Sequence, residues 1–303
     1  MDKMNDFKHN LDRFVVYLQV EKRASRSTIS NYRSDLERFV AFAQEQGAGD
    51  VLVCNVTQLM IRNYLTTMHA KGYSYATINR SLAALRSFFR FFCKQNILNA
   101  NPCENLHALK RKKTAASVLT SYEITDLLGL PDQSDLGRRD LAVLELLYAT
   151  GIRACELVKL VITDLDCFNG CAVISGSAGV ERIVPIGSRA VQALEQYIRQ
   201  SRPKLYHTDS EAPHDYAFVN SKGGPLTDRS VRRILSKYVD MLAWEQSVSP
   251  ATIRQTFAEH MLNNGADFCS VQEMLGQESL SQMLPSIGRE RIRSVYRSAH
   301  PRA

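Results

Sequence analysis

The sequence predicts a mainly α-helical protein, with an all-α N-terminal domain followed by an α+β domain that holds a small antiparallel sheet. Apolar residues recur at helical spacing through the first hundred positions and again from Thr227 to the end. Between these parts, two short β-rich runs at 171–175 and 181–186 flank Gly176 and Gly179, as the strands of a hairpin would. A chain of 303 residues is long enough for two domains of ordinary size.

Four helices are expected in the N-terminal domain. An apolar stripe from Phe7 to Leu18 indicates the first. A second is expected to start near residues 25–28, Ser-Arg-Ser-Thr, because Ser or Thr just before an apolar-periodic run is a helix-start signal. The third and fourth are expected over residues 57–70 and 75–95. Together they predict a helical bundle.

A domain boundary is expected soon after Asn101 and Pro102, because a residue that precedes proline disfavours the helical conformation. The positions that follow include a basic run and then small residues, which is typical of an exposed linker. That run is Lys110, Arg111, Lys112 and Lys113. The predicted parts are residues 1–108, a basic linker over 109–118, and residues 119–303.

The second domain is expected to open with a capped helix, since Thr120 and Glu123 fit a capping box ahead of an apolar run. A strongly apolar helix is expected from Asp140 to Ala149, closed by Gly151. The hairpin follows, and helical patterns then resume to the end of the chain. This order of elements predicts an α+β domain.

Composition narrows the class of protein. The chain is 45% hydrophobic and 23% charged, as expected for a folded protein with a real core, and has no apolar run that could span a membrane. Its first residues lead into no apolar signal segment, so we expect a cytoplasmic protein without a membrane partner. Of its seven cysteines only Cys167 and Cys171 are close, and no histidine is spaced to complete a zinc site. We expect reduced thiols and neither a metal nor a cofactor.

The net charge of +7 is distributed unevenly. Residues 1–113 hold 18 Lys and Arg against 9 Asp and Glu, a net of +9, whereas the remainder holds 20 against 22, a net of −2. A polyanion-binding module attached to a neutral domain would show this asymmetry. A basic solvated surface is the alternative interpretation.

Three stretches of the second domain carry recognisable motifs. Gly151 to Leu157 reads Gly-Ile-Arg-Ala-Cys-Glu-Leu, and residues 249–262 hold an arginine box with a trailing apolar helix. The third stretch has two pieces, residues 271–277 and 295–303. In this order and spacing they resemble the tyrosine recombinase (phage integrase) family, Xer-type members in particular. The N-terminal segments are similar to the same family's SAM-like, DNA-embracing domain, so the resemblance covers nearly the whole chain.

The resemblance implies a metal-free reaction on DNA. Members of the family attack a phosphodiester with a tyrosine hydroxyl and form a covalent phosphotyrosyl link. Two arginines grip the phosphate oxygens and stabilise the charge of the transition state. A lysine on the hairpin protonates the leaving oxygen, one histidine assists proton transfer, and a second histidine orients the phosphate.

This sequence keeps only part of that catalytic set. Arg153 and Arg254 match the two arginines. Four of the six positions have lost their chemistry, because the lysine, the two histidines and the tyrosine are replaced by Ser177, Ala251, Gln277 and Ser286 respectively. Proton-transfer groups are typically worth about 10²- to 10⁴-fold each in rate, so we expect no strand cleavage by this chain alone.

Alternative interpretations are open at this point. The chain would be an active site-specific recombinase if it used an unrecognised nucleophile, such as Ser286 or Tyr296, or one supplied by a partner. It would have no role if it were the product of a decaying gene. Arg153 also has a purely structural interpretation, as one side of an internal ion pair with Glu156.

The resemblance implies two kinds of partner. Double-stranded DNA would lie against two helices of the basic domain. The alternative interpretation is that these helix faces are solvated and contact no DNA. The residues expected to contact it are Arg26, Asn31, Arg33, Asn79, Arg80, Arg86 and Arg90, with Lys110, Arg111 and Lys112 of the linker. The last helix, over 291–303, is expected to dock onto a neighbouring protomer, either an active Xer-type recombinase or a second copy of this chain.

Overall fold

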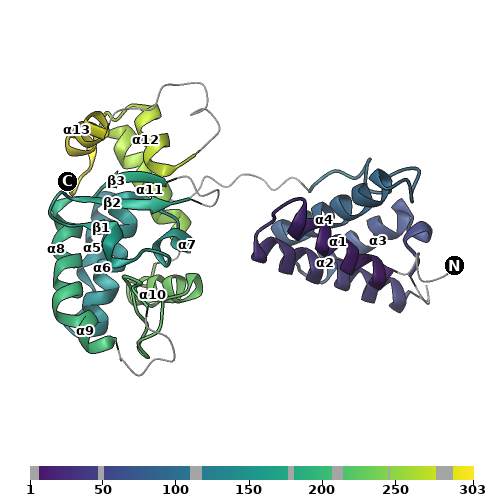
Figure 1. Cartoon of the computed structure of the whole chain (residues 1–303), viewed down its shortest axis with the longest axis horizontal. Coiled ribbons are helices and arrows are strands. Elements are labelled where there is room, and N and C mark those ends of the chain that lie inside the picture. Colours follow the sequence, from purple (N-terminus) through teal and green to yellow (C-terminus); the bar gives the residue numbers. More distant parts are fainter. Residues whose placement is uncertain are drawn as a thin grey trace. The chain divides into compact units, whose positions relative to one another are not determined.

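The computed structural model describes residues 7–46, 51–109, 118–176, 181–206, 214–244, 246–277 and 289–303. The chain separates into two compact units, residues 1–114 and 115–303 (Figure 1). The change from one unit to the next falls outside the described residues, as do Lys110, Arg111 and Lys112.

The first unit is a bundle of four α-helices, as predicted. These are α1 (Phe7–Val20), α2 (Arg26–Glu45), α3 (Gln58–Ala70) and α4 (Tyr75–Lys94), with a 3₁₀ turn η2 (Val53–Asn55) between α2 and α3. Ser25, Thr57 and Ser74 begin α2, α3 and α4, because each hydroxyl accepts a hydrogen bond from the backbone N–H three residues later.

Aromatic rings fill the core of the first unit. Phe88 of α4 stacks on Phe7 of α1 with ring centroids 4.5 Å apart and meets Phe14 edge-on at 5.4 Å. Phe39 and Tyr64 bring in α2 and α3, with centroids 5.3 Å apart. A fully buried phenylalanine contributes about 1.5–3 kcal/mol, so these rings tie the four helices into one folding unit.

The second unit is helical around a three-stranded antiparallel sheet of order β1-β2-β3. In register, Ile174 lies opposite Arg182 and Ala172 opposite Val184, which confirms the predicted hairpin. Its elements are α5 (Ser121–Gly129), α6 (Asp135–Thr150), α7 (Ala154–Leu157), η3 (Ile162–Asp164), β1 (Leu165–Asp166), β2 (Cys171–Ser175), β3 (Glu181–Pro185), α8 (Ser188–Gln196), the π-helical turn η4 (Tyr197–Ser201), α9 (Arg202–Leu205), α10 (Asp228–Met241), α11 (Pro250–Asn263), α12 (Phe268–Leu275) and α13 (Arg289–Ala299).

Helix α6 is the central element of the second unit, with twelve of its sixteen residues buried. It begins five residues before the predicted Asp140, because the Ser134 hydroxyl caps it by accepting from the Gly137 N–H at 3.0 Å. Arg139 and Asp140 are both buried in this helix and pair with one another at 2.6 Å. Gly151 ends α6 with φ of 59°, and a Cβ there would lie 2.5 Å from the Phe257 ring.

Helix α13 lies beside α12 (Figure 1) and packs into a small separate core. Ile292 and Tyr296 of α13 meet Phe257 of α11 and Met274 of α12 there. Beyond the helix, Arg302 forms an ion pair with Glu145 of α6. At the start of α8, a Cβ on Gly187 would lie 2.2 Å from the Arg302 carbonyl oxygen. The end of the chain is therefore fastened closely to α6 and α8.

Among the described residues, no helix is both long and apolar enough to cross a membrane.

Candidate functional site

The end of α6 places Arg153. The chain leaves α6 at Gly151, passes through Ile152 and enters α7, with Arg153 in an extended conformation at its N-cap. The Arg153 backbone N–H donates to Glu156 Oε2 at 2.8 Å, and its Nη1 donates to Glu156 Oε1 at 3.0 Å. The Arg153 side chain is still 45% exposed, and Glu156 is the one described residue that its guanidinium bonds to.

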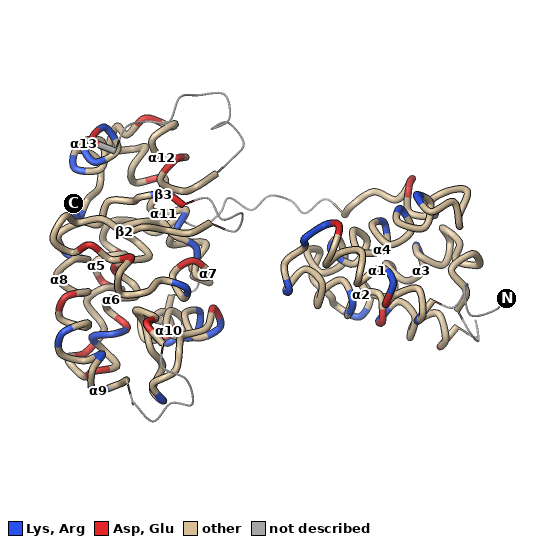
Figure 2. The backbone as a smooth tube through the Cα atoms, viewed as in Figure 1, with Lys and Arg blue, Asp and Glu red and all other residues tan. Residues whose placement is uncertain are grey.

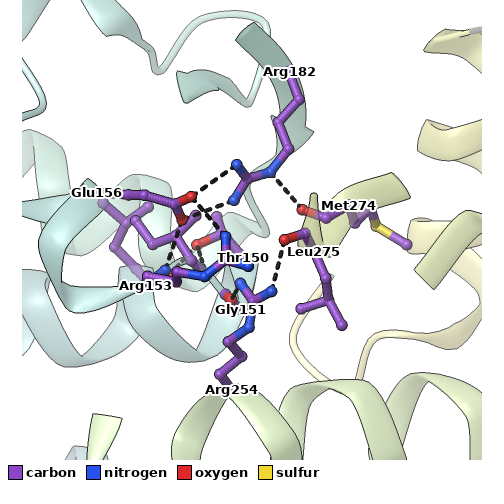
Figure 3. A network of polar contacts seen from close by, with 10 residues as sticks. Thr150, Gly151, Arg153, Glu156, Arg182, Arg254, Met274 and Leu275 are labelled. Atoms are coloured by element: carbon purple, nitrogen blue, oxygen red, sulfur yellow. Dashed lines mark hydrogen bonds and ion pairs between the residues drawn. The ribbon is translucent and has the colours of Figure 1, made fainter. Parts of the chain in front are cut away.

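Arg254 reaches the same place from α11. Ser249 caps that helix and Pro250 occupies its first turn, which presents Arg254 one turn further on. Arg254 Nη1 donates to the Gly151 carbonyl and Nη2 to the Leu275 carbonyl, each at 2.7 Å (Figure 3). These carbonyls end α6 and α12, where the helix dipoles place negative partial charge. One guanidinium therefore joins the C-terminal ends of two helices.

A third arginine, which sequence reasoning missed, completes the arrangement. Arg182 of β3 donates from Nη1 and Nη2 to the two oxygens of Glu156 at 3.0 and 2.9 Å, and from Nε to the Met274 carbonyl at 2.9 Å (Figure 3). A signal for it existed in the alternation of β3. Arg182 shares a sheet face with buried Val184, where a cation needs a partner.

The four side chains carry more positive than negative charge. Arg153, Arg182 and Arg254 surround the single carboxylate of Glu156, which is 5% exposed. Burial alone would raise the pKa of Glu156, but hydrogen bonds from Arg182 and Arg153 hold it below its ordinary value. Burial, and then the charge of Arg153, lower the pKa of Arg254 to about 10. Arg254 thus stays charged at neutral pH and touches no carboxylate among the described residues.

The other predicted catalytic positions fall in two groups. Ala251 is exposed at the start of α11, the helix that carries Arg254, and Gln277 is exposed two residues after Leu275, whose carbonyl accepts from Arg254. Neither a methyl group nor an amide can serve as an acid or a base at neutral pH. Ser177 and Ser286 lie outside the described residues.

Tyr296, the alternative nucleophile, lies in the small core of α11, α12 and α13. It is 2% exposed, its ring stacks on His300 with centroids 4.7 Å apart, and burial raises the pKa of its hydroxyl. His260, at 2.8 Å from the Tyr148 hydroxyl, is also a packing residue. In this arrangement neither side chain is accessible to a DNA strand.

The predicted DNA-contacting residues of the first unit divide by their contacts. Lys and Arg are spread over several of its helices (Figure 2). Four of the predicted side chains are engaged within the unit, with Arg33 on Asp12 and Glu37, Asn79 on the Leu109 backbone, Arg80 on Asp35, and Arg86 on the Leu106 carbonyl. The side chains of Arg26, Asn31 and Arg90 are exposed and bond to no described residue.

Within the described residues, no three His, Cys, Asp or Glu side chains cluster in a way that could hold a metal ion. The arrangement of Arg153, Arg182, Arg254 and Glu156, which we call the arginine site, offers positive charge and N–H donors instead. Its chemistry is that of an anion-binding site.

Comparison with known proteins identifies the family of the chain. Residues 117–284 match the model of the phage integrase family, and residues 11–96 match its N-terminal SAM-like domain. Tyrosine recombinase XerC of Oceanobacillus iheyensis is 40% identical over 99% of this chain and 98% of its own length. Tyrosine recombinase XerC of Bacillus subtilis is 39% identical over 99% of both chains.

Solved structures show the same fold at lower identity. The Tn1549 transposon integrase in complex with transposon right end DNA has a TM-score of 0.73 at 17% identity, covering 95% of this chain and 98% of that one. A lambda integrase dimer bound to a COC' core site has a TM-score of 0.70 at 18% identity, covering 94% and 99%. With two family models matched in order and XerC relatives along its whole length, the chain belongs to the phage integrase family of tyrosine recombinases.

Proposed function

We propose that this protein binds double-stranded DNA and acts in or on site-specific recombination without cleaving the strands itself. The observation that carries the proposal is the state of Arg254. It is a partly buried cation held only by backbone carbonyls, with no carboxylate against it among the described residues. A bound phosphate would supply the missing negative charge.

The donors left over at the arginine site suit a phosphate. A guanidinium has five N–H donors in a planar fork. Arg254 uses two of them on carbonyls, and the Arg153 side chain uses one on Glu156. The remaining donors can form the bidentate, charge-assisted bonds that arginine makes to phosphate oxygens.

The loss of cleavage is proposed from the residues around these arginines. Ala251 stands where a proton-transfer histidine would be, and Gln277 where a second histidine would be. Ser177 and Ser286 replace the lysine and the tyrosine in the sequence. An unperturbed serine is a poor nucleophile without an adjacent base. The combined loss removes the nucleophile and its helpers while leaving the phosphate grip.

The first unit supplies the rest of the proposed DNA interface. Its excess of positive charge suits the phosphate backbone, and Arg26, Asn31 and Arg90 are free to reach DNA. Related proteins support this use of the fold, since the Tn1549 and lambda integrase structures hold DNA. The lambda structure is also a dimer, which supports a partner for this chain, either a second copy or an active XerC-type recombinase.

The test is a covalent-capture experiment. The purified full chain, alone and with an active XerC-type recombinase, is incubated with labelled nicked duplexes that carry candidate core sites. We expect a shifted band on native gels and no covalent adduct of this chain on denaturing gels. An adduct of this chain that disappears in Ser286→Ala or Tyr296→Phe would overturn the proposal and identify the nucleophile. A chain that shifts no duplex would overturn the DNA-binding part.

A further inference from the structure

We infer that Arg182 is a positioning residue: it occupies the Glu156 carboxylate so that Arg153 is left free to hold a DNA phosphate. The inference rests on the proposed function, since it assumes that the arginine site binds phosphate. Arg182 touches no phosphate in this role. It acts through Glu156 and through the end of α12.

The hydrogen bonds at Glu156 support this division of labour. A carboxylate accepts about four hydrogen bonds. The Arg182 fork supplies two of them, one on each oxygen, and the Arg153 backbone N–H supplies a third. Only the fourth bond, on Oε1, comes from the Arg153 side chain. With Arg182 present, the carboxylate has no site left for a second bond from the Arg153 guanidinium.

Exposure separates the two arginines in the same way. The Arg182 side chain is 11% exposed and bound at three atoms, whereas that of Arg153 is 45% exposed and bound at one. Without Arg182, a buried carboxylate would be left with two vacant acceptor sites. The nearest cation able to fill them is Arg153, and a bidentate pair with Glu156 would compete with phosphate for its donors.

Arg182 also links Arg153 to Arg254, because it binds Glu156 on one side and the end of α12 on the other. Its Nε binds the Met274 carbonyl, and Arg254 binds the next carbonyl along, that of Leu275. The last turn of α12 therefore accepts hydrogen bonds from Arg182 and Arg254 at two consecutive carbonyls. Gly276 follows with φ of 61°, and a Cβ there would lie 2.9 Å from Arg182 Nη1, so the turn is fitted closely to this guanidinium.

The experiment measures how DNA binding by the full chain depends on salt. The probe is a labelled mixed-sequence duplex, because phosphate contacts do not require a specific site. Each phosphate contact contributes about 0.9 to the slope of log K against log salt concentration. The slope is negative, and throughout we compare its magnitude. We expect Arg153→Gln to lower that magnitude by about 0.9. Arg182→Gln is expected to lower it equally, although Arg182 touches no phosphate.

A double variant separates positioning from simple structural support. In Arg182→Gln with Glu156→Gln no carboxylate remains to capture Arg153, so the slope is expected to return to the wild-type value. Arg199→Gln is the matched control for loss of one cation, because Arg199 is exposed and its one ion pair within the described part of the chain is with Glu195. Thermal melting checks that each variant is folded, and Arg182→Lys, expected to give an intermediate slope, replaces Arg182→Gln if that variant does not fold.

The outcomes distinguish this inference from the proposed function. If Arg153→Gln lowers the slope and Arg182→Gln does not, the inference is wrong and the phosphate site stands. If the double variant stays as low as Arg182→Gln, Arg182 acts only by supporting the fold, and the inference is again wrong. If the wild-type chain does not bind the duplex, the proposed function itself fails.

Discussion

Each unit of this protein contains a buried carboxylate surrounded by arginines, and the two clusters differ in what they leave free. In the first unit, Asp35 is fully buried and takes two bonds from Arg80 and one from Arg38. In the second, Glu156 takes the fork of Arg182 and a single side-chain bond from Arg153.

The difference decides which arginines can reach DNA. Asp35 occupies Arg80, which the sequence placed on the DNA-facing side. Glu156 is filled by Arg182, for which the sequence predicted no role, and Arg153 is left largely unengaged. Whether Arg80 or Arg153 is available to DNA therefore depends on which cation neutralises the carboxylate beside it.

The largest expected effect is on stability. Arg182→Met should lower the free energy of unfolding of the second unit by about 3 kcal/mol, because the pair with Glu156 is buried on both sides. Arg80→Met should cost only about 1 kcal/mol, since the Arg80 side chain is 40% exposed and Asp35 keeps Arg38. Urea unfolding followed by the single tryptophan, Trp244, reports the second unit, and circular dichroism reports both. Equal losses would remove the distinction between the clusters.

DNA affinity should also separate the arginine site of the second unit from the Asp35 cluster of the first. Arg254→Gln should weaken duplex binding about tenfold or more, because a charge-assisted contact is worth about 1.5–3 kcal/mol. Arg80→Gln should change affinity much less, because Asp35 already holds that guanidinium. Titration of a labelled duplex at fixed salt measures both. A larger loss for Arg80→Gln would mean that Arg80 leaves Asp35 to bind DNA.

The pH dependence of stability extends the comparison from buried charged carboxylates to His300, a buried side chain that stays neutral. Burial lowers the pKa of His300 from 6.5 to about 4. As pH falls below 6.5 the unfolded chain takes up a proton that the folded chain does not, so stability is lost. We expect a loss of about 1 kcal/mol between pH 7 and about pH 5.5. His260, whose pKa burial also lowers, acts in the same direction.

Urea unfolding at the two pH values measures this loss. His300→Gln should remove most of it, and His69→Gln, which changes an exposed histidine of the first unit, should leave it unchanged. A wild-type stability that does not vary over this interval would contradict the prediction.

The smallest expected effect concerns the exposed arginines of the first unit. Arg26→Gln should reduce the salt slope of duplex binding by up to about 0.9, since its side chain is free. Arg33→Gln should reduce it less, because Arg33 already lies against Asp12 and Glu37 and its loss leaves those carboxylates near the DNA. The difference vanishes if both arginines reach phosphates equally.

The sequence was informative wherever a structure depends on near neighbours. The predicted capping box of Thr120 and Glu123 is present, with bonds of 2.7 and 3.2 Å, and α2 begins within the predicted stretch 25–28, with Ser25 as its cap. Arg153 and Arg254 were found from motifs of a few residues, and the structure brings both to the arginine site.

Pairings between distant residues could not be predicted in the same way. Arg80 and Asp35 are 45 positions apart, and Arg182 and Glu156 are 26 apart. Which carboxylate a guanidinium meets depends on how helices and strands pack, which helical spacing and strand alternation do not specify. For that reason the sequence predicted seven contacts on the first unit as one group, although only Arg26, Asn31 and Arg90 are free there.

The close fit at Gly187 gives experimental control over the last helix. Its backbone is in an ordinary extended conformation, yet a single methyl group there would overlap the Arg302 carbonyl and approach the Tyr296 hydroxyl. Gly187→Ala should therefore displace the end of the chain from α8. Because this substitution changes no residue of the arginine site, it would test separately whether a displaced C-terminal helix binds a second protomer.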